Sequence, residues 1–277
     1  MTEYGQHCLW RSTHASDDAQ ARELAARLEH RAKADDEVAA RDAYLTLLGV
    51  APGERVLEVG CGSGAITRAI ATRVGPTGHA VGLDQSPALL AIASELATSA
   101  GLADRIVFKV GDARRLPFED ACFDAVLAVT VLSHVPSGES AIPEFVRVVR
   151  PGGRVGIFDF DVDMSIFTHP DRVLTRRIVS AASDQTAMNS WLARQTPALL
   201  TKAGLQHVKV RGFFPIETEV KSFYGGLASR YADVAVTCGA ITDDERRGWL
   251  DAFRSAGQEG PIVAGRLHLF VWGRRPA

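Results

Sequence analysis

Between about residues 55 and 160, short apolar runs alternate with segments in which apolar residues recur at helical spacing. Turn-forming glycine and proline separate them, and the fourth run is apolar enough to be buried on both faces. Alternation of this kind predicts a parallel sheet with right-handed helical crossovers. The runs expected to form strands are 55–59, 79–84, 106–110, 123–129 and 154–158, and helices are expected over about 65–74, from Ser86 and Pro87 to Gly101, and around Ile142 to Val149.

The pattern changes after residue 160. We expect helices through about 160–203, a sixth strand over 206–214 and a last strand over 262–272. Before the last strand, helical spacing returns from Phe223, and Thr242 with Glu245 matches a helix capping box. We interpret 160–196 and 215–258 as helical insertions that form a lid on the sheet, where enzymes often carry substrate specificity.

The N-terminal segment is polar and rich in Ala, Arg and Glu. Weak helical spacing from about Asp17 to Leu47 predicts one or two helices that lead into the core. The chain is therefore divided into an N-terminal helical arm (1–40), a cofactor-binding core (41–160) and a remainder that completes the sheet and carries the lid (161–277).

Three glycines at alternate positions follow the first strand, in Gly60-x-Gly62-x-Gly64. Glycine permits backbone angles closed to other residues and lets a ligand approach the main chain, so a strand, a glycine turn and a helix predict a nucleotide-type ligand. Dinucleotide sites use the different spacing GxGxxG. Glu58, just before the turn, would repel a diphosphate but suits a ligand with positive charge, such as S-adenosylmethionine.

Two further carboxylates stand at strand ends. Asp84 ends the second strand, where a carboxylate can accept hydrogen bonds from both ribose hydroxyls. Asp112 follows the third strand, where it can accept from an adenine amino group. Each residue could instead cap a helix or turn, but their joint placement at successive strand ends favours an adenosine site.

These features resemble class I S-adenosylmethionine-dependent methyltransferases, and the pattern is most similar to the small-molecule branch that includes quinone-biosynthesis C-methyltransferases and natural-product enzymes of secondary metabolism. The resemblance covers about residues 40–160. The matching segments are Val56 to Gly64, Val81 to Ser86, Gly111 to Ala113 with Leu116-Pro-Phe118, Phe123 to Val126, and Val148 to Gly153.

The resemblance implies a Rossmann-like, doubly wound α/β fold with a seven-stranded, mostly parallel sheet whose last strand is antiparallel. It implies that Gly60 and Gly62 lie under the methionine part of the cofactor and that Asp84 binds the ribose. Its remaining implied cofactor contacts are Gln85 beside the adenine, Asp112 and Ala113 at the adenine edge, and Thr130 near the methionine.

One departure from related families narrows the substrate. Methyltransferases of amino groups in nucleic-acid bases carry an Asn/Asp-Pro-Pro-aromatic run after the fourth strand, whereas this chain has Ala128 to Ser133 there. The net charge of −2 also disfavours binding to a phosphate backbone. We therefore expect a small-molecule substrate rather than a nucleic acid.

The amino-acid composition indicates the class of protein and its cellular compartment but says little about its function. The chain has 277 residues, 46% hydrophobic and 23% charged, which is typical of a globular protein. Its four cysteines are far apart without a CxxC pair, which disfavours zinc and favours a reducing compartment. No apolar stretch is long enough to cross a bilayer. We expect a cytoplasmic protein that does not bind membranes, and a homodimer is left open.

His134 is the candidate catalytic residue. It follows the fourth strand on the rim where the transferred methyl group should lie. In the resembling phosphoethanolamine N-methyltransferases, a histidine at the matching place works with an N-terminal tyrosine, and Tyr4 is the tyrosine of this arm. The alternative is that His134 caps the next helix or packs on the lid.

The acidic run Asp159, Asp161 and Asp163, with His169 after it, could suggest a metal site, but a solvated rim explains it more simply, and we expect no metal. Aromatic residues of the lid are candidates to line a substrate pocket, although most should be core: Trp191, Phe213, Phe214, Phe223, Tyr224 and Tyr231. Arg176, Arg177 and Arg194 are expected at the surface, where one could pair with an acidic substrate.

The sequence thus predicts an S-adenosylmethionine-dependent enzyme that methylates O, C or N of a small, partly apolar metabolite. Placement of two reactants supplies about 7–11 kcal/mol, and a general base about 3–5 kcal/mol, so an obvious base is not required. The alternatives are an NAD(P)-dependent oxidoreductase, which Glu58 and the glycine spacing disfavour, and an inactive cofactor-binding scaffold of the same fold.

Overall fold

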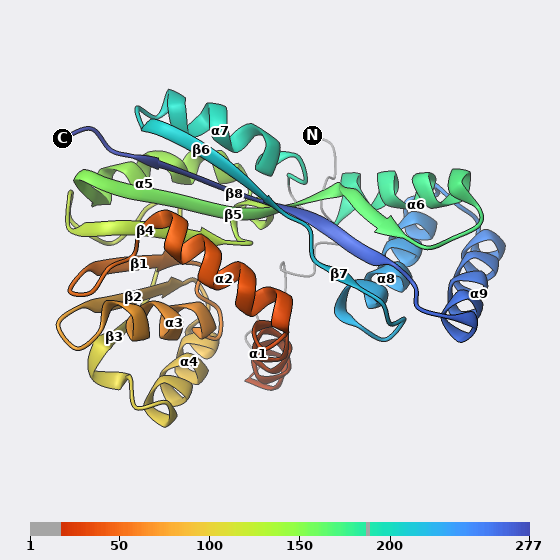
Figure 1. Ribbon diagram of the computed structural model, residues 1–277, viewed down its shortest axis with the longest axis horizontal. Helices are drawn as coiled ribbons and strands as arrows, with labels where there is room; N and C mark the ends of the chain where they lie inside the picture. Colours follow the sequence, from red (N-terminus) through yellow and green to blue (C-terminus); the bar gives the residue numbers. More distant parts are fainter. Residues whose placement is uncertain (1–17, 187–188) are drawn as a thin grey trace.

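The computed structural model describes residues 18–186 and 189–277, and it is built on one mixed sheet with helices on both faces (Figure 1). Strand order is β3-β2-β1-β4-β5-β8-β6, with the short β7 paired to β8. The strands are β1 Arg55–Val59, β2 His79–Asp84, β3 Ile106–Val110, β4 Phe123–Val129, β5 Val149–Phe167, β6 Gln206–Phe213, β7 Ile216–Glu217 and β8 Ala264–Arg274.

The strands β1 to β5 pair in parallel, and β8 is antiparallel to both β5 and β6. This confirms the expected Rossmann-like sheet with an antiparallel last strand, with β7 as a further two-residue strand. The helices are α1 Asp18–Ala32, α2 Asp35–Leu48, α3 Ala65–Val74, α4 Pro87–Ser99, α5 Ile142–Val148, α6 Arg172–Gln185, α7 Leu192–Lys202, α8 Phe223–Thr237 and α9 Asp243–Glu259.

Local sequence signals account for several helix ends. The Ser86 hydroxyl accepts a hydrogen bond from the Leu89 N–H, and Pro87 occupies the first turn of α4. Thr242 and Glu245 form both hydrogen bonds of a capping box at α9. The pattern before Gly49 proves to be two helices, α1 and α2, with Gly49 ending α2 in a left-handed conformation.

Three hydrophobic clusters hold the layers together. Side chains of α5 and α7 pack on one face of the sheet, and side chains of α2, α3 and α4 pack on the other. A third cluster joins α6, α8 and α9 to the far ends of β5 and β8, where Figure 1 shows these helices grouped beyond the main sheet. The core therefore has two parts, one around the main sheet and one under α6, α8 and α9, and the long strands β5 and β8 run through both.

The prediction that helix begins at residue 160 was wrong. β5 continues to Phe167 and pairs with β8 beyond that point, as in Phe160 with His268 and Phe167 with Ala264. Apolar and acidic residues alternate from Phe158 to Asp163, which is the period-two pattern of a strand. The first insertion consequently begins at α6 rather than at 160.

Candidate functional site

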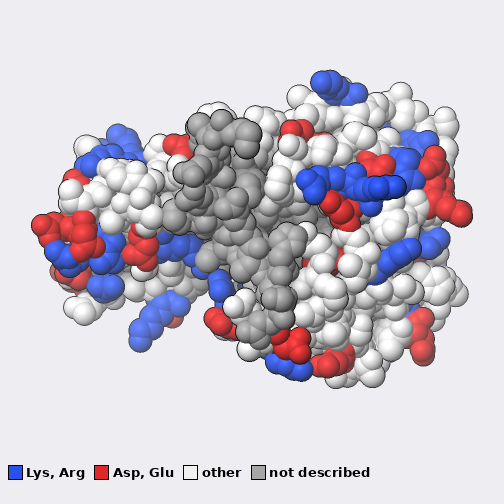
Figure 2. Space-filling view, turned by 180° about the vertical axis from the view of Figure 1, so that it is seen from behind, with Lys and Arg blue, Asp and Glu red and all other residues white. Residues whose placement is uncertain are grey.

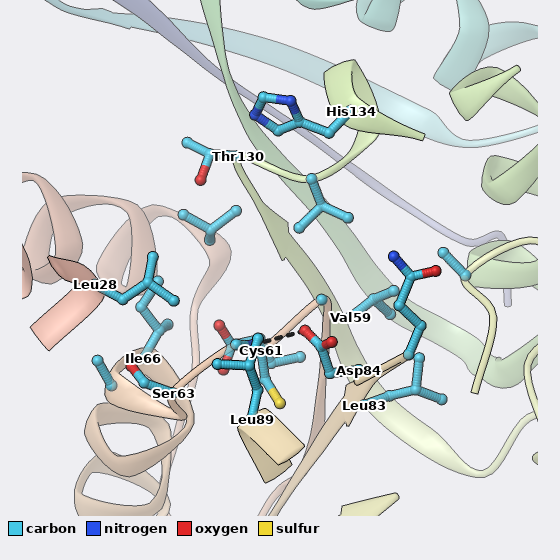
Figure 3. Close-up of a pocket in the computed structure, with 18 of the residues that line it drawn as sticks. Leu28, Val59, Cys61, Ser63, Ile66, Leu83, Asp84, Leu89, Thr130 and His134 are labelled. Atoms are coloured by element: carbon cyan, nitrogen blue, oxygen red, sulfur yellow. Dashed lines mark hydrogen bonds between the residues drawn. The ribbon is translucent and has the colours of Figure 1, made fainter. Parts of the chain in front are cut away.

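The glycine turn after β1 is tied to the end of β2. The N–H groups of Gly60 and Cys61 both donate to the Leu83 carbonyl, with N···O distances of 2.6 and 2.9 Å. The N–H of Gly62 donates to Oδ2 of Asp84 at 2.9 Å. The turn and the acidic end of the neighbouring strand therefore form one hydrogen-bonded unit, and Figure 3 shows Asp84 directed toward the turn.

Glycine is required at this turn for conformation and for space. Gly62 has a φ of +53°, and a Cβ there would lie 2.8 Å from Cδ1 of Leu28. Gly60 has a φ of +72°, and a Cβ there would collide with Val131. Any side chain at either position would be strained in the left-handed region and would fill the space beside the turn.

A cavity of about 620 Å³ lies above this turn and collects residues from the ends of β1, β2, β3 and β4. All but one of the candidate site residues line it, and Figure 3 shows Asp84 near one end with Thr130 and His134 near the other. The lining members are Glu58, Gly60, Gly62, Asp84, Gln85, Asp112, Ala113, Thr130 and His134.

Gly64 is the candidate that does not line the cavity. It adopts a φ of +75° as the N-cap of α3, and a Cβ on it would lie 2.8 Å from the Phe108 ring. Its observed place is therefore in the packing of α3 against β3, behind the turn.

Glu58 is a buried carboxyl, 1% exposed, at the base of the cavity. It accepts a short hydrogen bond from the Thr67 hydroxyl of α3. Burial raises the pKa of Glu58 to about 8, and the Asp84 charge acts in the same direction, whereas Thr67 and Arg68 oppose the rise. A cation bound beside this side chain would favour its ionised form.

Asp84 is buried and holds two backbone amides. Besides Gly62, the Ser86 N–H donates to its Oδ1 at 2.9 Å. Burial raises the pKa of Asp84, while the hydrogen bonds from Ser86 and Gly62 oppose that shift. Each carboxylate oxygen can accept a second hydrogen bond, so the group can still bind hydroxyls.

Asp112 is differently placed, because it is exposed and pairs with Arg114 at 2.7 Å. This ion pair lowers the pKa of Asp112. The side chain lines the cavity at its edge, where Arg114 already uses its two oxygens.

His134 ends the short 3-10 helix Leu132–His134 that follows β4. Its ring lies 5.2 Å from that of Phe160, centroid to centroid. Burial lowers the pKa of His134 to about 3, and the nearby charges of Arg266 and Arg31 act in the same direction. The imidazole is therefore neutral at physiological pH and is a weak base.

Sequence reasoning missed the contribution of α1 and α2 to the cavity wall. Arg31 of α1 pairs with Glu37 of α2 at 2.7 Å, and Tyr44 packs on Phe158 and Phe270 of the sheet. The sequence signal for this contribution was Tyr44, a large aromatic residue in a polar and charged helix. The cavity residues from this region are Leu28, Arg31, Ala32, Glu37, Arg41 and Tyr44.

The acidic run on β5 was wrongly interpreted as a solvated rim. Asp159 and Asp161 are each 1% exposed. Oδ1 and Oδ2 of Asp159 accept hydrogen bonds from the hydroxyl and the N–H of Ser133, and Asp161 forms an ion pair with Arg194. Their position in a continuous strand, rather than at its end, explains the burial.

No metal-binding cluster of acidic, histidine or cysteine side chains occurs within residues 18–186 and 189–277. His169 instead makes hydrogen-bond contacts with the Trp249 carbonyl and the Asp171 N–H. Tyr4, the proposed companion of His134, lies outside the described residues. Among the arginines expected at the surface, Arg177 pairs with Glu245 and Arg194 with Asp161.

The surface carries charges of both signs, and Figure 2 shows Lys and Arg interspersed with Asp and Glu on the face it draws. None of the helices in the described part of the chain has the length and apolar content needed to cross a bilayer.

A family model described as "Methyltransferase domain" matches residues 56–153. The matched segment begins in β1, contains the glycine turn with Asp84 and Asp112, and ends in β5. It therefore coincides with the part of the sheet that forms the base of the cavity.

Two curated relatives agree with this match. Methyltransferase GfsG of Streptomyces halstedii is 35% identical over 57% of this chain and 55% of its own length. The ubiquinone/menaquinone biosynthesis C-methyltransferase UbiE of Ectopseudomonas mendocina is 38% identical over 42% of this chain and 45% of its own length. The chain thus spans about half the length of these relatives.

Among solved structures, phosphoethanolamine N-methyltransferase 2 of Haemonchus contortus, in complex with S-adenosyl-L-methionine, aligns with 86% of this chain and 52% of its own. The TM-score is 0.55 at 19% sequence identity, which shows a common fold.

Proposed function

We propose, from the premise that this chain carries a class I S-adenosylmethionine-dependent methyltransferase domain, that it transfers a methyl group to a small, partly apolar metabolite. The observation that carries the proposal is the buried Glu58 beside the turn Gly60-x-Gly62-x-Gly64. The glycine spacing of this turn differs from the GxGxxG of dinucleotide-binding sites. The comparisons do not support the alternative of an NAD(P)-dependent oxidoreductase.

The cavity fits this cofactor in size and in chemistry. Its volume of about 620 Å³ lies within the usual range of small-molecule sites, about 300–1,000 Å³. Glu58 offers a buried acid to a cationic ligand, and Asp84 offers unused acceptor directions to a pair of hydroxyls. We assign Gln85, Asp112 and Ala113 to the adenine side and Thr130 to the methionine side.

The bound cofactor supplies an activated methyl group, so the protein mainly binds, orients and excludes water. The glycine turn and Asp84, which backbone hydrogen bonds hold together, orient the adenosine side. Preorganisation of this kind lowers the entropic cost of bringing the two reactants together. The acceptor side is bounded by His134 and by the α1 residues that face it.

Turnover is tested by incubating the protein with S-adenosylmethionine and a panel of aromatic and aliphatic metabolites, with S-adenosylhomocysteine measured by mass spectrometry. We expect at least one acceptor to yield a methylated product in an amount equal to that of S-adenosylhomocysteine. Cofactor binding with no S-adenosylhomocysteine across a broad panel would instead favour the inactive scaffold.

Substitution of Gly62 by alanine should weaken cofactor binding by about tenfold. A left-handed alanine costs about 1–2 kcal/mol, and its Cβ would meet Leu28 across the turn. Calorimetry with S-adenosylhomocysteine measures the effect. Gly226→Ala in α8 is the matched control, because a Cβ there has open space, and it should bind normally; equal affinity in both variants would contradict the assignment of the turn.

Substitution of His134 by alanine should lower kcat by no more than about tenfold while leaving cofactor affinity unchanged. A neutral imidazole whose pKa is about 3 is a poor proton acceptor, whereas a general base is worth about 10²–10⁴-fold. Kinetics of the first productive acceptor measure kcat. A fall of more than a hundredfold would assign His134 the role of general base.

A further inference from the structure

A second, smaller cavity of about 80 Å³ adjoins the first and shares Leu28, Arg31, Thr130 and His134 with it. Residues of α1, α8 and the long strands β5 and β8 line it. Four of its lining residues are arginines, namely Arg27, Arg31, Arg230 and Arg266.

Arg266 is the buried member of this set, with 6% of its surface exposed. Its guanidinium lies over the Phe160 ring at 4.0 Å from the centroid, and Nη1 donates to the Tyr231 hydroxyl at a long 3.4 Å. Its Nε is buried and has no hydrogen-bond partner among the described residues. Burial of a cation with unmade hydrogen bonds is costly, and an anion bound at Nε would lower that cost.

Arg266 interacts with a buried carboxylate through space rather than through a direct ion pair. No described carboxylate forms an ion pair with Arg266, whereas the neighbouring Arg31 is paired with Glu37. The nearby charge of Arg266 opposes the rise in the pKa of Asp159 that burial causes. The two Asp159 oxygens, however, accept hydrogen bonds from the Ser133 hydroxyl, the Ser133 N–H and the Phe160 N–H.

Arg230 adds a second cation at a more open place. It is half-buried, and no carboxylate of residues 18–186 or 189–277 pairs with it. Burial lowers the pKa of Arg230, and the nearby Arg27 adds repulsion. An anion between Arg230 and Arg266 would relieve both effects.

We propose that the methyl acceptor carries an acidic group, a carboxylate or a phosphate, that binds between Arg266 and Arg230. The inference rests on the proposed function and specifies its substrate class. Arg266 offers a planar donor edge suited to either oxyanion. Phe160 and Phe223, which line the same cavity, provide apolar surface for the remainder of the molecule.

Binding of simple probes tests this proposal independently of turnover. The protein saturated with S-adenosylhomocysteine is titrated by calorimetry with benzoate, with phenyl phosphate and with the neutral benzamide. We expect at least one anion to bind at least tenfold more tightly than benzamide, because hydrogen bonds between charged groups are stronger than those to a neutral amide. The preferred anion distinguishes a carboxylate acceptor from a phosphate acceptor.

Two variants assign the effect. Arg266→Gln and Arg230→Gln should each weaken the preferred anion by about tenfold or more, with unchanged affinity for S-adenosylhomocysteine. Arg254→Gln is the control, since Arg254 is exposed on α9 and pairs with Asp251. If Arg266→Gln does not fold, the half-buried Arg230 decides the test.

The outcomes separate the two proposals. Failure of the wild-type protein to bind S-adenosylhomocysteine would overturn the proposed function itself. Normal binding of that compound, with equal affinity for anions and benzamide or with anion affinity unchanged in the arginine variants, would overturn only the acidic acceptor.

Discussion

Asp84→Asn should weaken the binding of S-adenosylhomocysteine by at least about a hundredfold. The carboxylate holds the Gly62 amide at 2.9 Å and the Ser86 amide at 2.9 Å, and it is the proposed acceptor for the ribose hydroxyls. An asparagine keeps one carbonyl oxygen and places an N–H₂ donor against a backbone donor. Loss of two hydrogen bonds to a charged group, at about 1.5–3 kcal/mol each, gives this magnitude.

Calorimetry measures the affinity, and Asp104→Asn serves as the control because Asp104 is exposed and does not line the cavity. The thermal melting temperature of each variant shows whether the fold survives. Binding within a factor of three of wild type, in a folded Asp84→Asn protein, would remove Asp84 from the cofactor site.

The affinity for S-adenosylmethionine should rise by about tenfold per pH unit as pH increases toward about 8. Glu58 has a pKa of about 8 in the free protein, so it is largely protonated at neutral pH. A cationic ligand favours the carboxylate, and binding should therefore release a proton. Titrations in buffers of different ionisation enthalpy count that proton directly.

The stability of the free protein should show the opposite dependence. Because folding raises the pKa of Glu58 from its ordinary 4.5 to about 8, its contribution to stability is complete below the unfolded value and is lost as pH rises through about 8. Glu58→Gln should flatten both profiles. A cofactor affinity that keeps its full pH dependence in this variant would show that another group releases the proton.

The central part of the fold could be predicted because its signals are local. The apolar strand before Gly60, the N-cap at Ser86 and the capping box at Thr242 each act within a few residues. Carboxyl ends of parallel strands converge on one edge, so the sequence predicts that Glu58 and Asp84 lie close together, and both line the cavity.

The remainder depends on contacts between distant residues. The alternation from Phe158 to Asp163 has a strand period, but only pairing with β8, about a hundred residues later, shows that the strand continues. The approach of Arg31, Arg230 and Arg266 likewise joins α1, α8 and β8. A sequence pattern predicts which face of a helix or strand is buried, but it does not predict which distant element packs against that face.

The strands of the sheet differ in length, which separates the second cavity from the glycine turn. β4 pairs with β5 as far as Phe158, and β6 pairs with β8 as far as His268, whereas β5 and β8 continue together to Phe167 and Ala264. Arg266 and the helices α6, α8 and α9 therefore stand on an extension of the sheet that β5, β8 and the short β7 form (Figure 1). Substitutions in this extension can therefore change the second cavity while the hydrogen bond between Gly62 and Asp84 stays as it is.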